Sequence, residues 1–358
     1  MTWDLFQSNR TIPQHHKLIT CYAPFNHMRI RRNGEMHPCC FTTSKTRWKK
    51  DEVSLKDYWF GELNQSYQDA MLDGNLHKGC ELVCGTRIKN KIHPPINEYD
   101  WNVGDERLEH AMDASSYPKI FEFEISNLCN MACPMCNGEL SSKHMLGRDK
   151  DLKVYDPNVF DNNENLDQLI EQFKEFIPHL NEIRFVGGEP FSHKGLYKLC
   201  SAIAETNPDM RVQICTNGSV FNKKVLKMCQ ENNLKLTMSV DTIIPEEYSQ
   251  IRIGGNYDET FANVKKFAEY SNEVTVNATL MSINALNIDK LIAFAKENGF
   301  GFFINIYSRN GRSHTPDWSI STMTIDDRKT SIGRLTALLG DKDYEIYHEE
   351  IQKVIDLL

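Results

Sequence analysis

The sequence predicts an α/β fold with a mainly parallel sheet, preceded by a smaller α+β unit. Two observations support this prediction. From Pro118 onward, strand patterns with alternating apolar residues and helix patterns with apolar residues three or four apart follow each other through six strands. Before residue 90 the patterns are shorter and less regular. Repeated strand–helix alternation is typical of a parallel sheet with right-handed crossovers, so a functional site is expected at the carboxyl ends of the strands.

The elements follow in order along the chain. The first unit has a strand at 27–31, a turn toward Met36 and a helix at 54–72. Proline and turn residues between 90 and 117 predict a boundary, with a short helix at 105–112 inside it. The strands of the second unit are predicted at 120–125, 183–186, 211–215, 234–240, 274–281 and 302–307. Its helices are predicted at 165–180, 195–205, 223–232, 259–271, 288–298 and 343–358.

The length and the charge of the chain limit its possible domain organisation and its possible binding partners. A chain of 358 residues is longer than one compact domain usually needs, and we expect parts at 1–115, 116–310 and 311–358, the last a helical extension. The net charge of -8 argues against general nucleic-acid binding. Residues 1–92 carry +5, which suits an acidic partner or simply a solvated surface. No apolar signal core or membrane-spanning run is found, so a cytoplasmic location is expected.

Three of the eleven cysteines, Cys129, Cys133 and Cys136, directly follow the first strand of the second unit. Clustered cysteines in a chain without a secretion signal indicate metal binding or catalysis rather than disulfides. The spacing Cys-x3-Cys-x2-Cys can bring three thiolates to one 4Fe–4S cluster and leave one iron open for a ligand. A structural zinc knuckle is the alternative.

This cysteine run resembles the signature of the radical S-adenosylmethionine (SAM) superfamily, and the resemblance extends over most of residues 118–307. Gly187-Gly188-Glu189-Pro190 follows the second strand, as does the family motif that binds the amino group of SAM through backbone carbonyls and the glutamate. Arg252 matches an arginine that pairs with the SAM carboxylate. Met135 stands where the family often has an aromatic residue near the adenine. Further SAM contacts are implied at Thr216, Asn217, Ser239, Asp241 and Asn277.

The resemblance implies both fold and chemistry. The fold is an incomplete (β/α)6 TIM-like barrel. SAM binds the open iron through its amine and carboxylate, and the reduced cluster transfers one electron to the sulfonium. The resulting 5′-deoxyadenosyl radical abstracts hydrogen from a substrate, while the protein excludes water and oxygen. A flavodoxin- or ferredoxin-type electron donor is implied as a partner.

A second group of cysteines precedes the barrel: Cys21, Cys39, Cys80 and Cys84. With the Gly-x-x-x-Pro-Cys step that ends at Cys39, it resembles the twitch domain, the shorter relative of the SPASM domain, which holds an auxiliary 4Fe–4S cluster. The domain lies unusually at the N-terminus. Cys40 is the rival of Cys39, because neighbouring side chains of a strand point in opposite directions. Zinc bound by four thiolates is the alternative for this site.

The substrate is the least determined part of the prediction. A peptide or protein substrate is expected, as in many twitch and SPASM relatives. A radical SAM oxidase or epimerase that acts on a small molecule shares every motif, and a non-catalytic iron–sulfur or zinc protein is the alternative of another class. The remaining cysteines Cys200, Cys215 and Cys229 are expected to be small packed side chains.

Overall fold

The computed structural model describes residues 7, 14–43, 46–89, 113, 115–147, 156–308 and 316–358. Within these residues, eight strands form one sheet in the order β2-β1-β3-β4-β5-β6-β7-β8. The chain divides into two compact units. Unit 1 comprises 1–126, 156–184 and 202–210, and unit 2 comprises 127–155, 185–201 and 211–358. The predicted domain boundaries after residues 115 and 310 stay a prediction.

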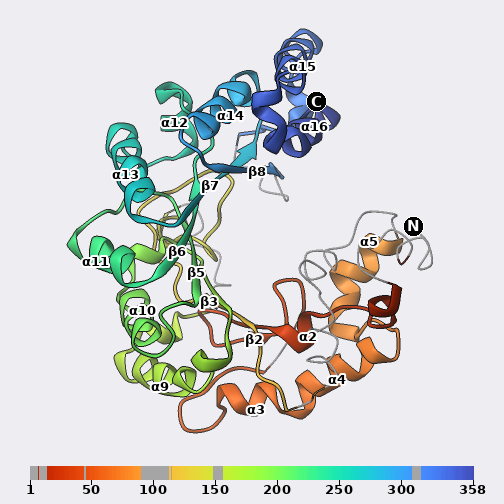
Figure 1. Ribbon diagram of the computed structural model, residues 1–358, viewed down its shortest axis with the longest axis vertical. Helices are drawn as coiled ribbons and strands as arrows, with labels where there is room; N and C mark the ends of the chain where they lie inside the picture. The colour runs from red at the N-terminus through yellow and green to blue at the C-terminus, as the bar shows by residue number, and fades with distance from the viewer. Residues whose placement is uncertain are drawn as a thin grey trace. The chain divides into compact units, whose positions relative to one another are not determined.

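Unit 1 combines a short strand pair with small helices and the first barrel strand. Strand β1 (His27–Ile30) pairs antiparallel with β2 (Met36–His37) and parallel with β3 (Ile120–Glu124) (Figure 1). The helices and turns of this unit are η1 (Gln14–Leu18), α2 (Ala23–Asn26), α3 (Leu55–Trp59), α4 (Glu62–Leu72), η2 (Lys78–Cys80), η3 (Glu81–Gly85), α5 (Thr86–Lys89), η4 (Val159–Asp161), α9 (Asn163–Lys174) and η5 (Ile177–His179). Strand β4 (Glu182–Val186) and helix α10 (Lys194–Thr206) each belong partly to both units.

The single helix predicted at 54–72 is wrong, because the structure has two helices there. Ser54 caps α3 by accepting a hydrogen bond from the Asp57 backbone at 3.1 Å, and the Asp57 carboxylate accepts one from the Ser54 backbone at 2.7 Å. The chain then turns at Gly61, where a Cβ atom would lie 2.0 Å from the carbonyl oxygen of Asp57. Only glycine fits this break, and the helical pattern of the sequence continues across it.

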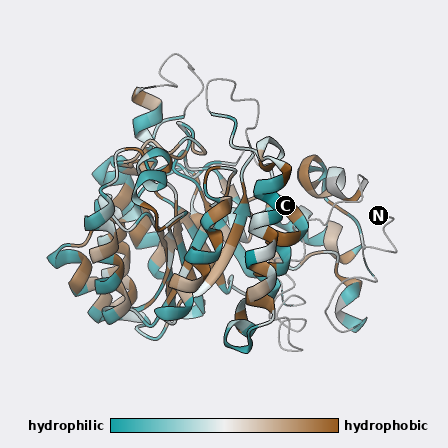
Figure 2. Ribbon diagram, turned by 90° about the horizontal axis from the view of Figure 1, so that it is seen from above, coloured by the Kyte–Doolittle hydropathy of each residue, from teal (hydrophilic) through white to brown (hydrophobic). Residues whose placement is uncertain are grey.

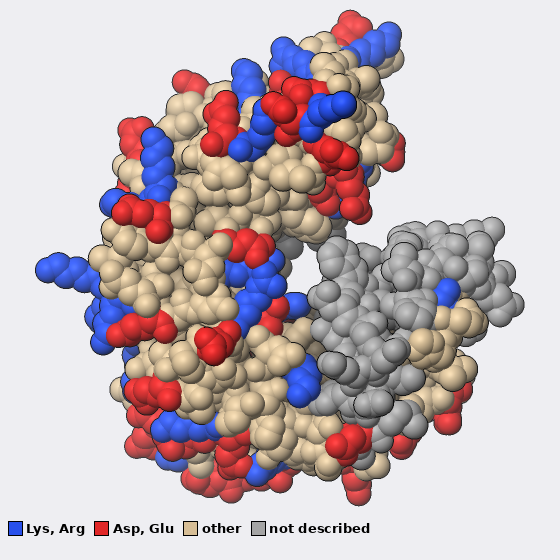
Figure 3. All heavy atoms as spheres, in the orientation of Figure 1, with Lys and Arg blue, Asp and Glu red and all other residues tan. Residues whose placement is uncertain are grey.

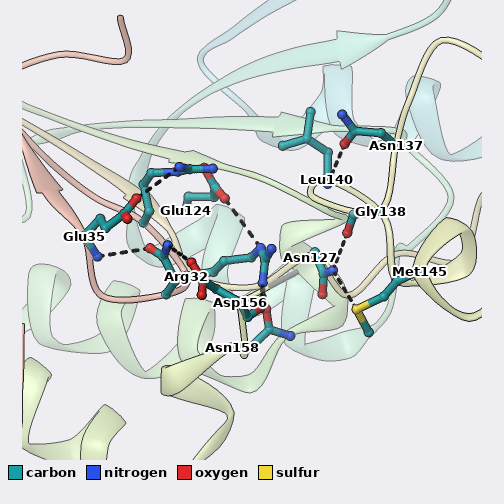
Figure 4. A network of polar contacts seen from close by, with 12 residues as sticks. Arg32, Glu35, Glu124, Asn127, Asn137, Gly138, Leu140, Met145, Asp156 and Asn158 are labelled. Carbon is teal, nitrogen blue, oxygen red and sulfur yellow. Dashed lines mark hydrogen bonds and ion pairs between the residues drawn. The ribbon is translucent and has the colours of Figure 1, made fainter. Parts of the chain in front are cut away.

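A buried charged network holds the strands of unit 1 together. The carboxylate of Glu124, at the end of β3, accepts hydrogen bonds from Arg29 at 2.6 Å and from Arg31 at 3.5 Å. The guanidinium of Arg32, which is 1% exposed, donates to the backbone oxygen of Asp156 and to Asn158 (Figure 4). Because an unpaired charge at such depth is costly, these pairs fix the register of the segments that they join.

Unit 2 contains a parallel sheet of β5 (Arg211–Thr216), β6 (Asn233–Ser239), β7 (Glu273–Leu280) and β8 (Gly301–Ile306). Even-numbered residues of β5 to β7 are buried, whereas their odd-numbered residues are half-buried or exposed. Helices α11 (Lys223–Glu231), α12 (Pro245–Ile251), α13 (Tyr257–Tyr270) and α14 (Ile288–Glu297) lie on one side of these strands (Figure 1). Hydrophobic and hydrophilic residues alternate along both kinds of element (Figure 2). One sheet face is therefore core, and the other is a polar surface.

The last helices cover the outer edge of β8. Helix α15 (Ile325–Leu339) and the turn η9 (Lys342–Tyr347) lead to α16 (His348–Leu357). The backbone N–H of Ile304 donates to the Glu350 carboxylate at 2.9 Å, and the Lys353 ammonium donates to the carbonyl oxygen of Ile304 at 2.8 Å. Two side chains thus bind backbone groups that a further strand would otherwise pair.

The observed elements confirm the six strands that the sequence predicts from residue 118 onward. The helix predicted at 165–180 is shorter, because Pro178 lies in the separate turn η5 after α9 has ended. The predicted C-terminal helix at 343–358 is divided into η9 and α16, and α15 lies in the part predicted only as a helical extension. Helices α8 (Ser142–Leu146) and α12 were not predicted. The helix predicted at 105–112 lies outside the described residues.

Acidic and basic side chains are interspersed on the face shown in Figure 3. In the part of the chain that the structure describes, no helix is both long and apolar enough to span a bilayer.

Candidate active site and iron–sulfur centres

The three cysteines after β3 lie in a loop that is stabilised by hydrogen bonds between its own residues. The side-chain amide of Asn127 donates to the carbonyl oxygen of Gly138 at 2.7 Å (Figure 4). Ser141 donates through its hydroxyl to the carbonyl oxygen of Met131 at 2.7 Å. The ring of the buried His144 contacts the carbonyl oxygen of Cys133 at 2.8 Å, which makes it a structural residue of the loop. These bonds hold 127–144 as one compact turn around the thiols.

Cys129, Cys133 and Cys136 all line one cavity of about 240 Å³. Burial raises the pKa of the Cys129 and Cys133 thiols, and it raises the pKa of Cys136 to about 12. The thiols therefore stay protonated at neutral pH until a cation binds, and metal binding displaces their protons.

The turn after β4 reaches this cysteine loop through its backbone. Gly188 has φ +55°, and a Cβ atom there would lie 2.4 Å from the carbonyl oxygen of Leu128. The backbone N–H of Glu189 donates to that same oxygen at 2.7 Å. Gly187 and Gly188 line the cavity. Glycine is required at position 188 because the two backbones approach too closely for any side chain.

The carboxylate of Glu189 points toward the end of β5. It accepts hydrogen bonds from the Thr216 hydroxyl at 2.8 Å, the Asn217 backbone at 2.7 Å and the Phe191 backbone at 3.2 Å. Glu189 is 1% exposed, and burial raises the pKa of its carboxyl to about 7. Glu189 and Pro190 are buried and lie outside the cavity lining, so the motif presents its glycines to the cavity.

Two nitrogen donors lie next to the thiols. The side-chain amide of Asn217 is 3.9 Å from the Cys129 sulfur, and the guanidinium of Arg252 is 3.9 Å from the Cys133 sulfur. Arg252 also forms an ion pair with Asp241, at 2.6 Å from Nε to the carboxylate. The other Asp241 oxygen accepts from the Thr279 backbone at 2.8 Å. The pair therefore places a balanced charge beside the cavity.

The structure brings together most of the residues that the sequence selects. Thr216, Asn217, Ser239 and Arg252 line the cavity with the cysteines, while Asp241 lies behind Arg252. Asn277 is not part of the lining, and its side-chain oxygen accepts a hydrogen bond from the Asn305 amide at 2.8 Å.

The lining also contains residues that the sequence analysis did not select for this site. Thr279 is one, and Cys215 is another. Cys215 was expected to be packed, but it is half-buried with its sulfur 3.8 Å from the Ser239 hydroxyl. Its position as an odd-numbered residue at the end of β5 is the signal that could have identified it. Cys200 and Cys229 are buried, as predicted.

The four cysteines of unit 1 surround a second, smaller cavity. Cys21, Cys39, Cys80 and Cys84 are each 7% exposed and line a cavity of about 20 Å³ with apolar neighbours, whereas Cys40 is exposed. Burial raises the pKa of Cys39 to about 11 and also raises the pKa of Cys80. Among the described residues, no three His, Cys, Asp or Glu side chains are grouped closely enough for a single metal ion.

Both sets of residues fit iron–sulfur clusters by their chemistry. Grouped thiols are suitable ligands for iron, and the nitrogen donors beside Cys129 and Cys133 suit anionic sulfur. The larger cavity has space for a further ligand beside its three thiols, whereas the smaller cavity is lined by four thiols and has little free space.

Family models match both parts of the chain. Residues 123–296 match the model of the radical SAM superfamily, and residues 21–85 match that of an iron–sulfur cluster-binding domain, the SPASM domain. Residues 123–296 therefore form a radical SAM domain. The predicted incomplete (β/α)6 barrel with an N-terminal iron–sulfur domain is thereby confirmed, as are SAM and iron–sulfur clusters as the cofactors of these domains.

The chain is also similar to curated proteins. It is 22% identical over 213 residues to molybdenum cofactor biosynthesis protein 1 of Dictyostelium discoideum, across 57% of this chain and 32% of that protein. It is 24% identical over 179 residues to the GTP 3′,8-cyclase of Clostridium perfringens strain 13, across 49% of this chain and 50% of that enzyme. The chain thus spans about a third to a half of the length of these relatives.

Solved structures resemble it more distantly. SuiB of Streptococcus suis bound to S-adenosylmethionine aligns with a TM-score of 0.46 and 16% identity, over 76% of this chain and 62% of that one. Native anSMEcpe with bound AdoMet aligns with a TM-score of 0.47 and 19% identity, over 65% of this chain and 62% of that one.

Proposed function

We propose that this protein is an enzyme that reductively cleaves SAM to a 5′-deoxyadenosyl radical and abstracts hydrogen from a substrate. The observation that carries the proposal is the cavity lined jointly by Cys129, Cys133 and Cys136, the Gly187–Gly188 turn and Arg252. The cluster, when bound, supplies one electron to SAM. In this proposal the three thiolates hold it, and the fourth iron remains open.

The chain's own residues would bind and orient SAM. Backbone carbonyls of the Gly187–Gly188 turn are suitable acceptors for an ammonium group. Arg252 and the hydroxyl of Ser239 are donors suited to a carboxylate and a ribose, and the thioether of Met135 is suited to the adenine. Met135 also packs against Ile251, Met281 and Tyr307, which keep water from that side.

The decisive experiment measures SAM cleavage. Protein reconstituted with iron and sulfide without oxygen and then reduced is expected to form 5′-deoxyadenosine and methionine from SAM. Cys129→Ser should abolish this product, and Cys40→Ser, at an exposed cysteine, serves as the matched control. A wild-type protein that binds iron but forms no 5′-deoxyadenosine would favour the non-catalytic alternative.

We further propose that Cys21, Cys39, Cys80 and Cys84 hold an auxiliary 4Fe–4S cluster. Cys39 is preferred to Cys40 because it is buried and lines the cavity with the other three. About eight irons per chain are expected for two such clusters. Cys39→Ser should lower this number by about half, whereas Cys40→Ser should not. About four irons accompanied by zinc would contradict the auxiliary cluster.

For the substrate, we propose a peptide or protein side chain or backbone. Support comes from the net charge of +5 in residues 1–92 and from the amide and hydroxyl groups of Asn277, Asn305 and Thr279 on the open sheet face, which suit a peptide backbone. A flavodoxin or ferredoxin would be the electron donor, and the cytoplasm the location.

A small-molecule substrate is the second candidate, because the proteins similar to this chain include enzymes named GTP 3′,8-cyclase. An oxidase or epimerase acting on a sugar, amino acid or other metabolite belongs to this class. Turnover separates the two candidates. Substrate-dependent acceleration of 5′-deoxyadenosine formation by acidic peptides, but not by nucleotides or sugars, is expected. The reverse result would select the small-molecule class.

A further inference from the structure

The side chain of Asn217 is held in one orientation beside the cysteine loop. Its amide oxygen accepts hydrogen bonds from the Ser219 hydroxyl at 2.6 Å and from the Ser219 backbone at 2.9 Å. Because both donors face the oxygen, the amide nitrogen must point the other way. There it lies 3.0 Å from the side-chain oxygen of Asn130 and 3.9 Å from the sulfur of Cys129.

The backbone of Asn217 is fixed as well. Its N–H donates to the buried Glu189 carboxylate at 2.7 Å, and the residue is 8% exposed. Asn217 therefore joins the turn after β4, the end of β5 and the cysteine loop. A group held this firmly keeps its dipole aimed at one atom throughout a change in the charge of that atom.

Asn217 differs from Arg252, the other donor near a thiol. Arg252 shares its charge with Asp241 at 2.6 Å, so its field at Cys133 is largely balanced. The amide of Asn217 is neutral, and its nitrogen contacts a neutral amide oxygen and the thiol. A hydrogen bond to a cluster sulfur stabilises the more negative, reduced state and raises the reduction potential.

We propose that Asn217 is a positioning residue that raises the reduction potential of the cluster held by Cys129, Cys133 and Cys136, through an N–H···S hydrogen bond to Cys129. The proposal rests on the proposed function, because it requires that cluster. The consequence for the reaction is that the cluster accepts its electron more readily while SAM is bound at the open iron.

The test compares Asn217→Ala, Asn217→Asp and Asn130→Ala with the wild-type holoenzyme. Each protein is titrated between its redox states, and the cluster signal that responds to SAM is followed by electron paramagnetic resonance. Asn217→Ala is expected to shift the midpoint potential to a more negative value. Asn217→Asp should shift it further, because a carboxylate oxygen then faces the thiolate. Asn130→Ala removes an exposed side chain of the same network and should leave the potential unchanged.

The iron content of each protein is measured first, so that loss of the cluster is not mistaken for a shift of the midpoint potential. If Asn217→Ala holds too little iron, Ser219→Ala replaces it, since this change removes the hydroxyl that binds the amide oxygen but keeps the backbone N–H bond to it and both amides. Equal potentials in the wild type and the loaded variants, or an equal shift in Asn130→Ala, would overturn the inference. A wild-type spectrum without any response to SAM would instead contradict the proposed function.

Discussion

Glu189 shows how one side chain can serve the site without facing it. Its carboxylate accepts three hydrogen bonds, two of them from residues at the end of β5, and its backbone N–H binds the cysteine loop. The neighbouring glycines, Gly187 and Gly188, line the cavity instead. At the scale of single residues, the site depends on a buried acid that ties two loops together.

The raised pKa of Glu189 predicts a pH-dependent stability. Because its folded-state pKa of about 7 exceeds the usual value of 4.5, folding favours the protonated acid. Its contribution is therefore complete below about pH 4.5 and is lost as the pH rises through 7, on the order of 3 kcal/mol in total. Urea unfolding of cluster-free protein between about pH 5 and pH 8 should show this loss.

The variant Glu189→Gln isolates this effect, since its side chain carries no charge at any pH. Its free energy of unfolding should change less with pH than that of the wild type. The exposed Glu297→Gln is the matched control for removal of a carboxylate. If the free energy of unfolding depended on pH in the same way in Glu189→Gln and Glu297→Gln, the burial of Glu189 would not be the cause of that dependence.

Gly188→Ala should disrupt the contact between the two loops. The new Cβ would collide with the backbone of Leu128 at 2.4 Å, in addition to the strain of φ +55°. We expect a loss of roughly 2–4 kcal/mol in thermal unfolding. Gly299→Ala is the control, because Gly299 has φ +68° but nothing within 4 Å. Equal losses in both variants would show that strain alone matters.

Residue-scale features differ in how far the sequence predicts them. Cys129, Cys133 and Cys136 follow from their spacing, whereas the four cysteines of residues 21–84 were selected through the resemblance to a twitch domain. The direction of the Glu189 carboxylate follows from neither, since it depends on donors from residues 216 and 217, distant in sequence. Cys215 was missed for a similar reason: its exposure depends on which sheet face is covered.

At the scale of elements, α16 acts through two side chains on β8. Glu350→Ala combined with Lys353→Ala removes both bonds to Ile304, leaving its N–H and carbonyl without these partners. We expect a loss of about 1–3 kcal/mol and concentration-dependent self-association, measured by light scattering.

The matched control changes the exposed side of the same helix, with Glu349→Ala and Gln352→Ala. This variant should remain as monodisperse as the wild type. Self-association of both variants to the same extent would point to general loss of the helix rather than to the strand edge.

Element predictions succeeded where periodicity persists and failed where tertiary contacts interrupt it. The strands of the barrel were found because their alternation is uninterrupted over five or more residues. The break at Gly61 was missed because it depends on the carbonyl of Asp57 in the folded chain. Gly61 itself has a low helix propensity, but a single glycine within a helical pattern is often tolerated, so the prediction continued the helix across it.

At the scale of the whole molecule, removal of metal should destabilise two separate regions, one around each set of cysteines. Iron binding to native thiolates stabilises only the folded state. Chelation is therefore expected to increase hydrogen exchange in residues 21–85 and in the loop at 127–144, while β5 to β8 change little. Mass spectrometry of backbone exchange measures this. A uniform increase along the chain would show that the clusters support the whole fold.

The order of an iron–sulfur domain followed by a radical SAM domain was predictable, because each cysteine set lies in its own part of the sequence. The compact units were not, since residues 156–184 and 202–210 join unit 1 through packing and the charged network around Arg32. The substrate class also remains a proposal, as neither spacing nor periodicity encodes the shape of a bound molecule.

The alternation of the sheet in unit 2 has a consequence for how this protein could change over generations. Even-numbered residues of β5 to β7 lie in the core, so most substitutions there would lower the stability of the fold. Odd-numbered residues such as Thr237, Thr275 and Asn277 are only half-buried, so replacing them should cost less stability than replacing the core residues. New substrates could therefore be explored on one face while the scaffold that carries the cysteines stays intact.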